Sequence, residues 1–153
     1  MLYDRSYMQK PFRISSRSVV DILLIILLFC FILQSVVGLF SYNFSVLVHH
    51  YLYFSPTALS EFLIWTPITY SLFHDGPFHL ILNMLGFYFI GKNVEVMMGK
   101  LNFCYLLLIG SILGSLFWLV FNTGGDYLVG SSAVVMASLS FYCLRQPDNL
   151  ITL

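Results

Sequence analysis

Residues 78–121 read FHLILNMLGFYFIGKNVEVMMGKLNFCYLLLIGSILGSLFWLVF, two apolar runs with one short polar break between them. The break is KNVEVMMGK, residues 92–100. Each run comes close to or exceeds the ~20 residues that a helix needs to cross the hydrocarbon core of a bilayer. The stretch therefore predicts two consecutive transmembrane helices, at about 78–96 and 101–121.

Similar apolar runs lie on either side of this stretch. One occupies about 19–40 and contains DILLIILLFCFILQSVVGLF, and the other occupies about 128–144, after the polar break NTGGD. A signal peptide also starts with basic residues, but its apolar core is only about 7 to 15 residues long and precedes a small-residue cleavage site, which is missing here. We predict an all-α membrane protein, a polytopic helical bundle with four transmembrane helices.

The composition agrees with this fold class. Hydrophobic residues make up 59% of the 153 residues and charged residues only 9%, against roughly 25% charged residues in a soluble domain. The net charge is zero, and no basic patch with interleaved aromatic residues is present, which argues against a nucleic-acid partner. The expected surroundings are a lipid bilayer.

The cysteines and two adjacent histidines give no sign of a metal site. Cys30, Cys104 and Cys143 lie inside apolar runs without CxxC or CxxH spacing, so we expect buried packing residues and neither a disulfide framework nor a zinc site. Neighbouring positions such as His49 and His50 cannot project onto one helix face. The sequence implies no metal and no cofactor.

The basic residues predict the orientation of the chain. In the four-helix arrangement all seven fall on one side of the membrane: Arg5, Lys10, Arg13, Arg17, Lys92, Lys100 and Arg145. By the positive-inside rule, the basic segment 1–18 is cytoplasmic and the long loop 41–77, which has no Lys or Arg, faces outward. Since organellar targeting features are lacking, we expect a bacterial inner membrane.

The outward loop differs from an ordinary solvent-exposed linker. It contains YLYFSPTALSEFLIWTPITYSLF, which is aromatic and apolar but is broken by Pro56 and Pro67. Tyr and Trp favour the headgroup region of a bilayer, and short amphipathic helices lying in the membrane plane suit this composition. We therefore expect an interfacial loop.

His79 and Asn83 are polar residues inside the second span. Their i, i+4 spacing places both side chains on one helix face, about 6 Å apart along the axis. Because this helix enters from the outer side, both lie in the outer leaflet, where both can donate hydrogen bonds to a developing negative charge. The alternative is that they only hydrogen-bond a neighbouring helix.

The tetrapeptide Gly130-Ser131-Ser132-Ala133 opens the fourth span, which also enters from outside. At ~1.5 Å per residue, Ser132 comes within the first turn or two, at about the depth of His79 and Asn83. Free backbone N–H groups and the positive end of the helix dipole favour an oxyanion at such a position. Taken alone, small residues at such a position are more typical of close helix packing.

Other small and charged residues have structural interpretations. Glu95 and Gly99 end the second span beside basic residues, where a carboxylate most often anchors or pairs. Gly110 and Gly114 form a GxxxG on the third span, which indicates packing. Small-residue faces of this kind also predict self-association.

Taken in order, these residues resemble the rhomboid family of intramembrane serine proteases. The resemblance covers about Trp65 to Leu144, and the first span fits more loosely. Its elements follow one another at fitting intervals: Trp65, His74, the HxxxN of His79 and Asn83, Glu95 with Gly99, and the GxSx of Gly130 to Ala133. The full series is specific, although a single element would mean little.

The resemblance implies roles for these residues. Ser132 would be the nucleophile, with His79, Asn83 and the Ser132 backbone N–H as oxyanion donors. Structural roles would fall to Trp65, His74, Glu95, Gly99 and Gly130, and Ser131 occupies the variable position of the motif. Two departures from the family pattern are Thr66, where Arg commonly follows the Trp, and Met136, where bacterial relatives often have an aromatic residue.

The largest departure concerns the general base. In rhomboids the base is a histidine on the sixth helix, but this chain has no histidine after His79 and no fifth or sixth span. A serine hydroxyl is a poor nucleophile at neutral pH without an adjacent base. We therefore expect residues 19–153 to form an incomplete rhomboid-like membrane domain, truncated after four of six helices.

Three functions remain open. The first is a rhomboid protease that cleaves transmembrane protein substrates, represented here by a truncated chain. The second is a catalytically inactive rhomboid-like protein that binds membrane clients. A channel or transporter segment is disfavoured, since no span carries a row of charges or a broken helix in corresponding halves.

Overall fold

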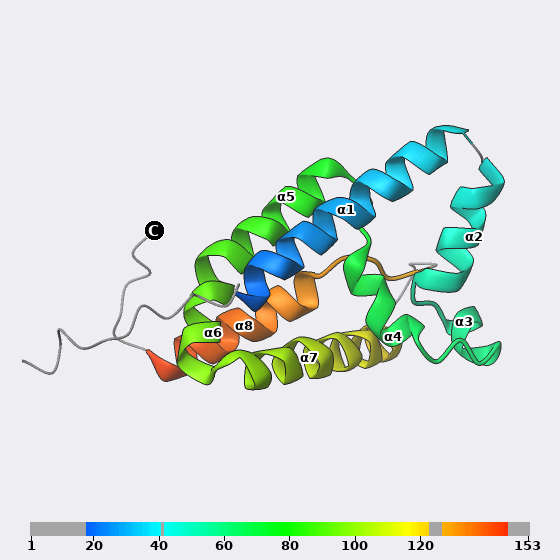
Figure 1. The fold of residues 1–153 in the computed structure, drawn as a ribbon. Coiled ribbons are helices and arrows are strands. Elements are labelled where there is room, and N and C mark those ends of the chain that lie inside the picture. The colour runs from blue at the N-terminus through cyan, green and yellow to red at the C-terminus, as the bar shows by residue number, and fades with distance from the viewer. Residues whose placement is uncertain (1–17, 41, 123–126, 147–153) are drawn as a thin grey trace, which may run out of the picture.

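The computed structural model describes residues 18–40, 42–122 and 127–146. Figure 1 shows a helical bundle with shorter helices gathered at one end. The α-helices are α1 (Val19–Phe40), α2 (Tyr42–Leu52), α3 (Pro56–Ser60), α4 (Thr66–Thr69), α5 (Pro77–Gly86), α6 (Lys92–Met98), α7 (Lys100–Phe121) and α8 (Ser132–Arg145). A 3-10 helix, Tyr70–Leu72, follows α4, and a π-helical turn, Phe87–Gly91, joins α5 to α6.

Among the described residues, three helical segments are long and apolar enough to cross a membrane, which makes this an integral membrane protein. They are α1, the continuous run Pro77–Met98 formed by α5, the π turn and α6, and α7. The first has the predicted bounds, and the other two extend the predicted spans by one or two residues. The prediction of an all-α membrane bundle is confirmed.

The fourth helix differs from its prediction. It begins at Ser132, four residues later than expected, because Leu128 forms an isolated antiparallel bridge with Phe54 and Gly130 has a φ of 109° that no helix accommodates. With 14 residues, α8 is about 21 Å long, shorter than the ~30 Å hydrocarbon core. A helix of this length that ends at one membrane surface begins within the membrane.

The loop between the first two spans is folded against the bundle. Its short helices are tied by side-chain bonds to backbone carbonyls: Trp65 Nε1 donates to Tyr51 O at 2.8 Å, and Thr69 Oγ1 donates to Leu52 O at 2.8 Å. Tyr70 is fully buried and donates from its hydroxyl to Ser111 O on α7 at 3.0 Å. The loop thereby becomes part of the scaffold around the start of α8.

Small residues set the distance between α7 and α8. A Cβ built on Gly114 would lie 2.5 Å from the Ala133 Cβ, and one built on Gly110 would lie 3.4 Å from the Ala137 Cβ. The GxxxG of α7 therefore packs against α8 inside the same chain. Self-association through these four residues would require the two helices to separate.

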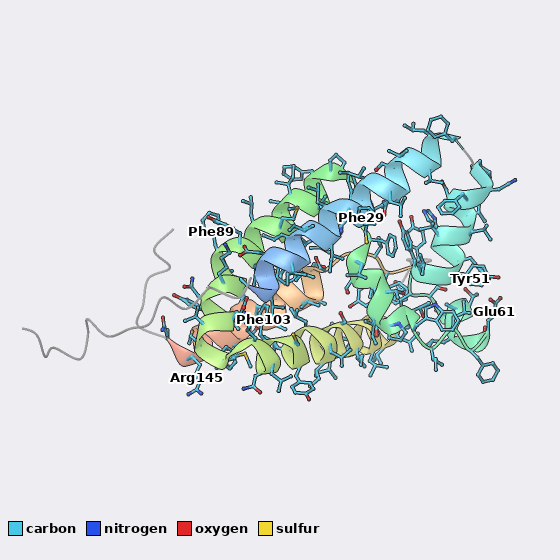
Figure 2. The ribbon with its side chains drawn as sticks, viewed as in Figure 1. Phe29, Tyr51, Glu61, Phe89, Phe103 and Arg145 are labelled. Carbon is cyan, nitrogen blue, oxygen red and sulfur yellow. The ribbon has the colours of Figure 1, made fainter. Side chains whose placement is uncertain are left out.

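The bundle surface is largely apolar, as a lipid-facing surface requires. Phe29 and Phe89 project from this surface, whereas Phe103 is fully buried where α7 meets α6 (Figure 2). Cys104 and Cys143 are exposed. The expectation that the cysteines are buried packing residues was therefore wrong for these two, since their apolar runs face outward.

Glu95, in the first turn of α6, caps the beginning of α1. Its carboxylate accepts hydrogen bonds from the Ser18 hydroxyl and from the backbone N–H groups of Val19 and Val20, the latter two at 2.9 and 3.0 Å. These N–H groups have no partner within their own helix. The predicted basic segment 1–18 otherwise lies outside the described residues.

Candidate active site

Ser132 is the first residue of α8 and is exposed, while the neighbouring Ser131 is buried. It opens onto a groove of about 450 Å³ between α7 and α8. The other lining residues are mostly apolar: Gly114, Phe117, Trp118, Phe121, Asn122, Leu128, Ala133 and Met136. A hydroxyl at the wall of an apolar groove is accessible to a bound chain.

The backbone around Ser132 provides hydrogen-bond donors. The N–H groups of Val134 and Val135 both donate to Ser131 O at 3.0 Å. Within the described part of the chain, no acceptor faces the N–H groups of Ser132 and Ala133, the first two residues of the helix. Free N–H groups at the positive end of a helix dipole stabilise an oxyanion.

His79 lies directly against Gly130, two residues before Ser132. A Cβ on Gly130 would lie 2.4 Å from His79 Cε1 and 2.7 Å from Nε2, so only glycine leaves room for the imidazole. One turn further along α5, Asn83 is buried and donates from Nδ2 to His79 O at 3.1 Å. The structure thus brings His79 to the start of α8.

His74 has a contact that sequence reasoning missed. Its Nε2 lies 3.2 Å from the Ser131 Oγ, both residues being buried, and its backbone carbonyl accepts a 2.6 Å bond from Gln34 Nε2 on α1. Burial, and secondarily the nearby His79 ring, lower the pKa of His74 to about 4. The imidazole is therefore neutral at physiological pH.

The segment before α8 is held by the outward loop. Gly130 N–H donates to Tyr70 O at 3.0 Å, and Phe54 and Leu128 exchange two backbone bonds of 3.2 and 2.7 Å. These contacts join residues about 60 to 75 positions apart in the sequence. They fix the turn from which Ser132 projects.

The remaining predicted structural residues lie elsewhere. Trp65 contacts α2 through Tyr51 O, and Gly99 joins α6 to α7 with a φ of 80°. Glu95 caps α1. None of these three takes part in the contacts around Ser132.

Among the described residues, no histidine side chain forms a hydrogen bond with Ser132, although the His79 ring contacts Gly130. His50 pairs with Glu61 at 3.0 Å and His49 stacks on Tyr53 with ring centroids 4.4 Å apart, both in the outward loop. His74 contacts Ser131 instead. The same residues contain no group of three or more His, Cys, Asp or Glu that could hold a metal ion.

A model of the rhomboid domain matches residues 61–153 of this sequence. The chain belongs to the rhomboid family. Rhomboids are intramembrane serine proteases that act on transmembrane substrates within the bilayer. The match includes His79, Asn83 and the Gly130–Ala133 motif, whose contacts are described above. The resemblance predicted from the sequence is thereby confirmed.

Proposed function

We propose that Ser132 is the nucleophile of a rhomboid serine protease site, with His79, Asn83 and the Ser132 backbone N–H as oxyanion donors. The observation that carries the proposal is the exposed Ser132 at the open end of α8, with the His79 imidazole held against Gly130. Trp65, His74, Glu95, Gly99 and Gly130 have structural roles in this proposal.

The geometry supports a nucleophile and oxyanion donors for acyl transfer. The Ser132 Oγ attacks the carbonyl carbon of a scissile peptide bond, and the free N–H groups at the start of α8 stabilise the oxyanion that forms. The hydroxyl proton needs an acceptor, because the alkoxide is scarcely populated at neutral pH. Residues 1–153 contain no histidine to accept it after His79, so we propose that this chain by itself does not hydrolyse peptide bonds.

The alternative is a non-catalytic protein that binds membrane clients. It is favoured by the apolar groove beside Ser132, which has room for part of a chain whether or not chemistry follows. In that case photo-crosslinkers at Phe117 and at Met136, which line the groove from α7 and α8, would capture a transmembrane helix with equal yield in the parent and in Ser132→Ala.

A serine-reactive fluorophosphonate tests the proposed chemistry. We expect the purified 153-residue chain not to be labelled at pH 7.5, because Ser132 lacks a base. Labelling that disappears in Ser132→Ala but persists in Ser131→Ala would show an active nucleophile and contradict the proposed inactivity. Labelling that disappears only in Ser131→Ala would contradict Ser132 as the nucleophile.

We also propose the location of the protein. The N-terminal segment 1–18 is cytoplasmic and the loop 41–77 faces outward, since all seven basic residues lie on one side of the predicted spans. The membrane is a bacterial inner membrane. Transmembrane protein substrates and lipids are the partners.

A further inference from the structure

A groove of about 290 Å³ lies between α1 and the second span, which Figure 1 shows side by side. Its lining is apolar: Leu24 comes from α1, and Ile81, Met84, Leu85 and Tyr88 come from α5 and the π turn. Ile81, Leu85 and Tyr88 are three to four residues apart in the chain, so they form one stripe along the helix. The groove therefore follows the axis of the span, inside its apolar length.

Two opposite charges stand at one end of this groove. Lys92, one turn after Tyr88, has its Nζ 4.6 Å from the centroid of the Tyr88 ring and 2.8 Å from Asp21 Oδ1. Asp21 is one turn before Leu24 on α1. The Lys92 and Asp21 side chains are 37% and 47% exposed, so both charges are accessible from the lipid surroundings.

The ion pair leaves both groups with capacity for further hydrogen bonds. The Lys92 ammonium has three N–H donors, and the Asp21 carboxylate accepts up to about four bonds. Glu95, the next acidic residue along α6, is engaged at the start of α1 by the Val19 and Val20 N–H groups. The end of the groove therefore offers a cationic donor and an anionic acceptor side by side.

The size of the groove favours an acyl chain over a protein helix. A helix with its side chains is about 10–12 Å across and rises about 5.4 Å per turn, so a single turn already exceeds the volume of about 290 Å³. A helix could only rest on the rim, whereas one hydrocarbon chain can lie lengthwise between the side chains. Lysine near the end of a span also reaches the headgroup region.

We propose that the groove holds one acyl chain of an ethanolamine phospholipid, whose headgroup is bound by Asp21 and Lys92. The Lys92 ammonium binds the phosphate, and the Asp21 carboxylate accepts hydrogen bonds from the primary ammonium of the lipid. A glycerol headgroup brings no cation to Asp21, and choline brings a cation without an N–H donor. The site lies at the other end of the second span from His79 and Ser132, and it does not depend on hydrolysis there.

Native mass spectrometry of the delipidated 153-residue chain in detergent tests this site. Phosphatidylethanolamine, phosphatidylcholine and phosphatidylglycerol with identical acyl chains are titrated separately. We expect one phosphatidylethanolamine to bind with about 10-fold higher affinity than either of the other lipids, which corresponds to one hydrogen bond between charged groups.

Two kinds of variant separate the headgroup contact from the groove. Asp21→Asn keeps the shape of the side chain and removes its charge, so the affinities for the three lipids should come within about 2-fold of one another. Ile81→Trp fills the groove and should weaken the binding of all three lipids by about 10-fold or more. Leu82→Trp is the matched control: Ile81 and Leu82 are 51% and 52% exposed, but Leu82 does not line the groove.

Three results overturn the proposal: equal binding of the three lipids by the parent chain, an ethanolamine preference that persists in Asp21→Asn, or equal lipid binding by Ile81→Trp and Leu82→Trp. The tryptophan pair leaves both charges in place, so it decides the question even if Asp21→Asn does not fold. A transmembrane protein that binds the parent chain and is displaced by Ile81→Trp, with no lipid retained, would assign the groove to a helix and also contradict the proposal.

Discussion

Gly130 is required for two independent reasons. Its φ of 109° lies in a region that side chains disfavour, and a Cβ would overlap the His79 ring at 2.4 Å. Both demands arise at one residue because the chain must turn sharply into α8 while the imidazole lies against that turn. Both requirements support the structural role that we propose for Gly130.

Gly130→Ala should therefore destabilise the protein strongly. Backbone strain of about 1–3 kcal/mol adds to displacement of the imidazole, so we expect a loss of about 3 kcal/mol or more in the free energy of unfolding. Tryptophan fluorescence during denaturation in detergent measures it. Gly76→Ala is the matched control, since a Cβ there meets no atom within 4 Å; equal losses in the two variants would contradict the argument.

The neutral His74 makes stability depend on pH. Its pKa is lowered from 6.5 to about 4 by burial and by His79, so the unfolded chain binds more protons between these two values. Stability from this group is fully present above pH 6.5 and decreases as the pH falls toward 4, by about 3 kcal/mol at pH 4.

The measurement is the midpoint of thermal unfolding in detergent at a series of pH values. Carboxylates titrate in the same range, so the contribution of His74 is the difference between the wild type and His74→Gln. A difference that stays constant from pH 7 to pH 4 would contradict a buried, neutral imidazole.

Single residues were only partly predictable from the sequence. The i, i+4 spacing and the topology placed His79 on the outer side of the second span, and the structure puts its ring at the start of α8. The contact between His74 and Ser131 joins residues 57 positions apart. No periodicity indicates a contact at that separation, and Ser131 occupies a position that the family motif leaves variable.

Among the elements, α7 and α8 show how small residues determine a helix crossing. Gly114 faces Ala133 and also the Tyr70 hydroxyl, which lies 2.9 Å from a Cβ built on Gly114. Gly110, one turn away, has ordinary contact distances. The two glycines of one motif therefore have different tolerance to substitution.

Gly114→Ala should lower the free energy of unfolding by about 1–3 kcal/mol, because the added methyl group overpacks a rigid contact between two helices and the loop. Gly110→Ala should stay within about 1 kcal/mol, since a methyl group fits at 3.4 Å and alanine favours the helix. Thermal unfolding of the two variants side by side tests the difference. A larger loss of stability in Gly110→Ala than in Gly114→Ala would contradict this packing of α7 against α8.

The spans were the most predictable elements. Length and hydrophobicity alone gave α1 with the bounds 19–40 and α7 within one residue, because the bilayer imposes both properties on any spanning helix. The start of α8 was not predictable in this way. Leu128 is apolar and fits a helix by composition, but it pairs with Phe54 on the distant loop, a tertiary contact that overrides local preference.

For the whole molecule, the proposed orientation can be tested by cysteine labelling. In a chain whose native cysteines are replaced by alanine, Ser60→Cys in the outward loop should react with a membrane-impermeant maleimide in intact cells. Asn102→Cys, near the start of α7, should react only after the membrane is permeabilised. Both sites are exposed. The reverse labelling pattern would show that the chain has the opposite orientation in the membrane.

The cap that Glu95 provides for α1 constrains the order of assembly during synthesis. The first helix enters the membrane with Val19 and Val20 N–H groups that bond a carboxylate 75 to 76 residues later in the chain. At a synthesis rate of about 5–20 residues per second, that carboxylate follows about 4–15 s afterwards. During this interval the Val19 N–H depends on water or lipid headgroups, whereas the Val20 N–H can already donate to the Ser18 hydroxyl oxygen at 3.2 Å. The complete cap of α1 therefore forms only when the second span arrives.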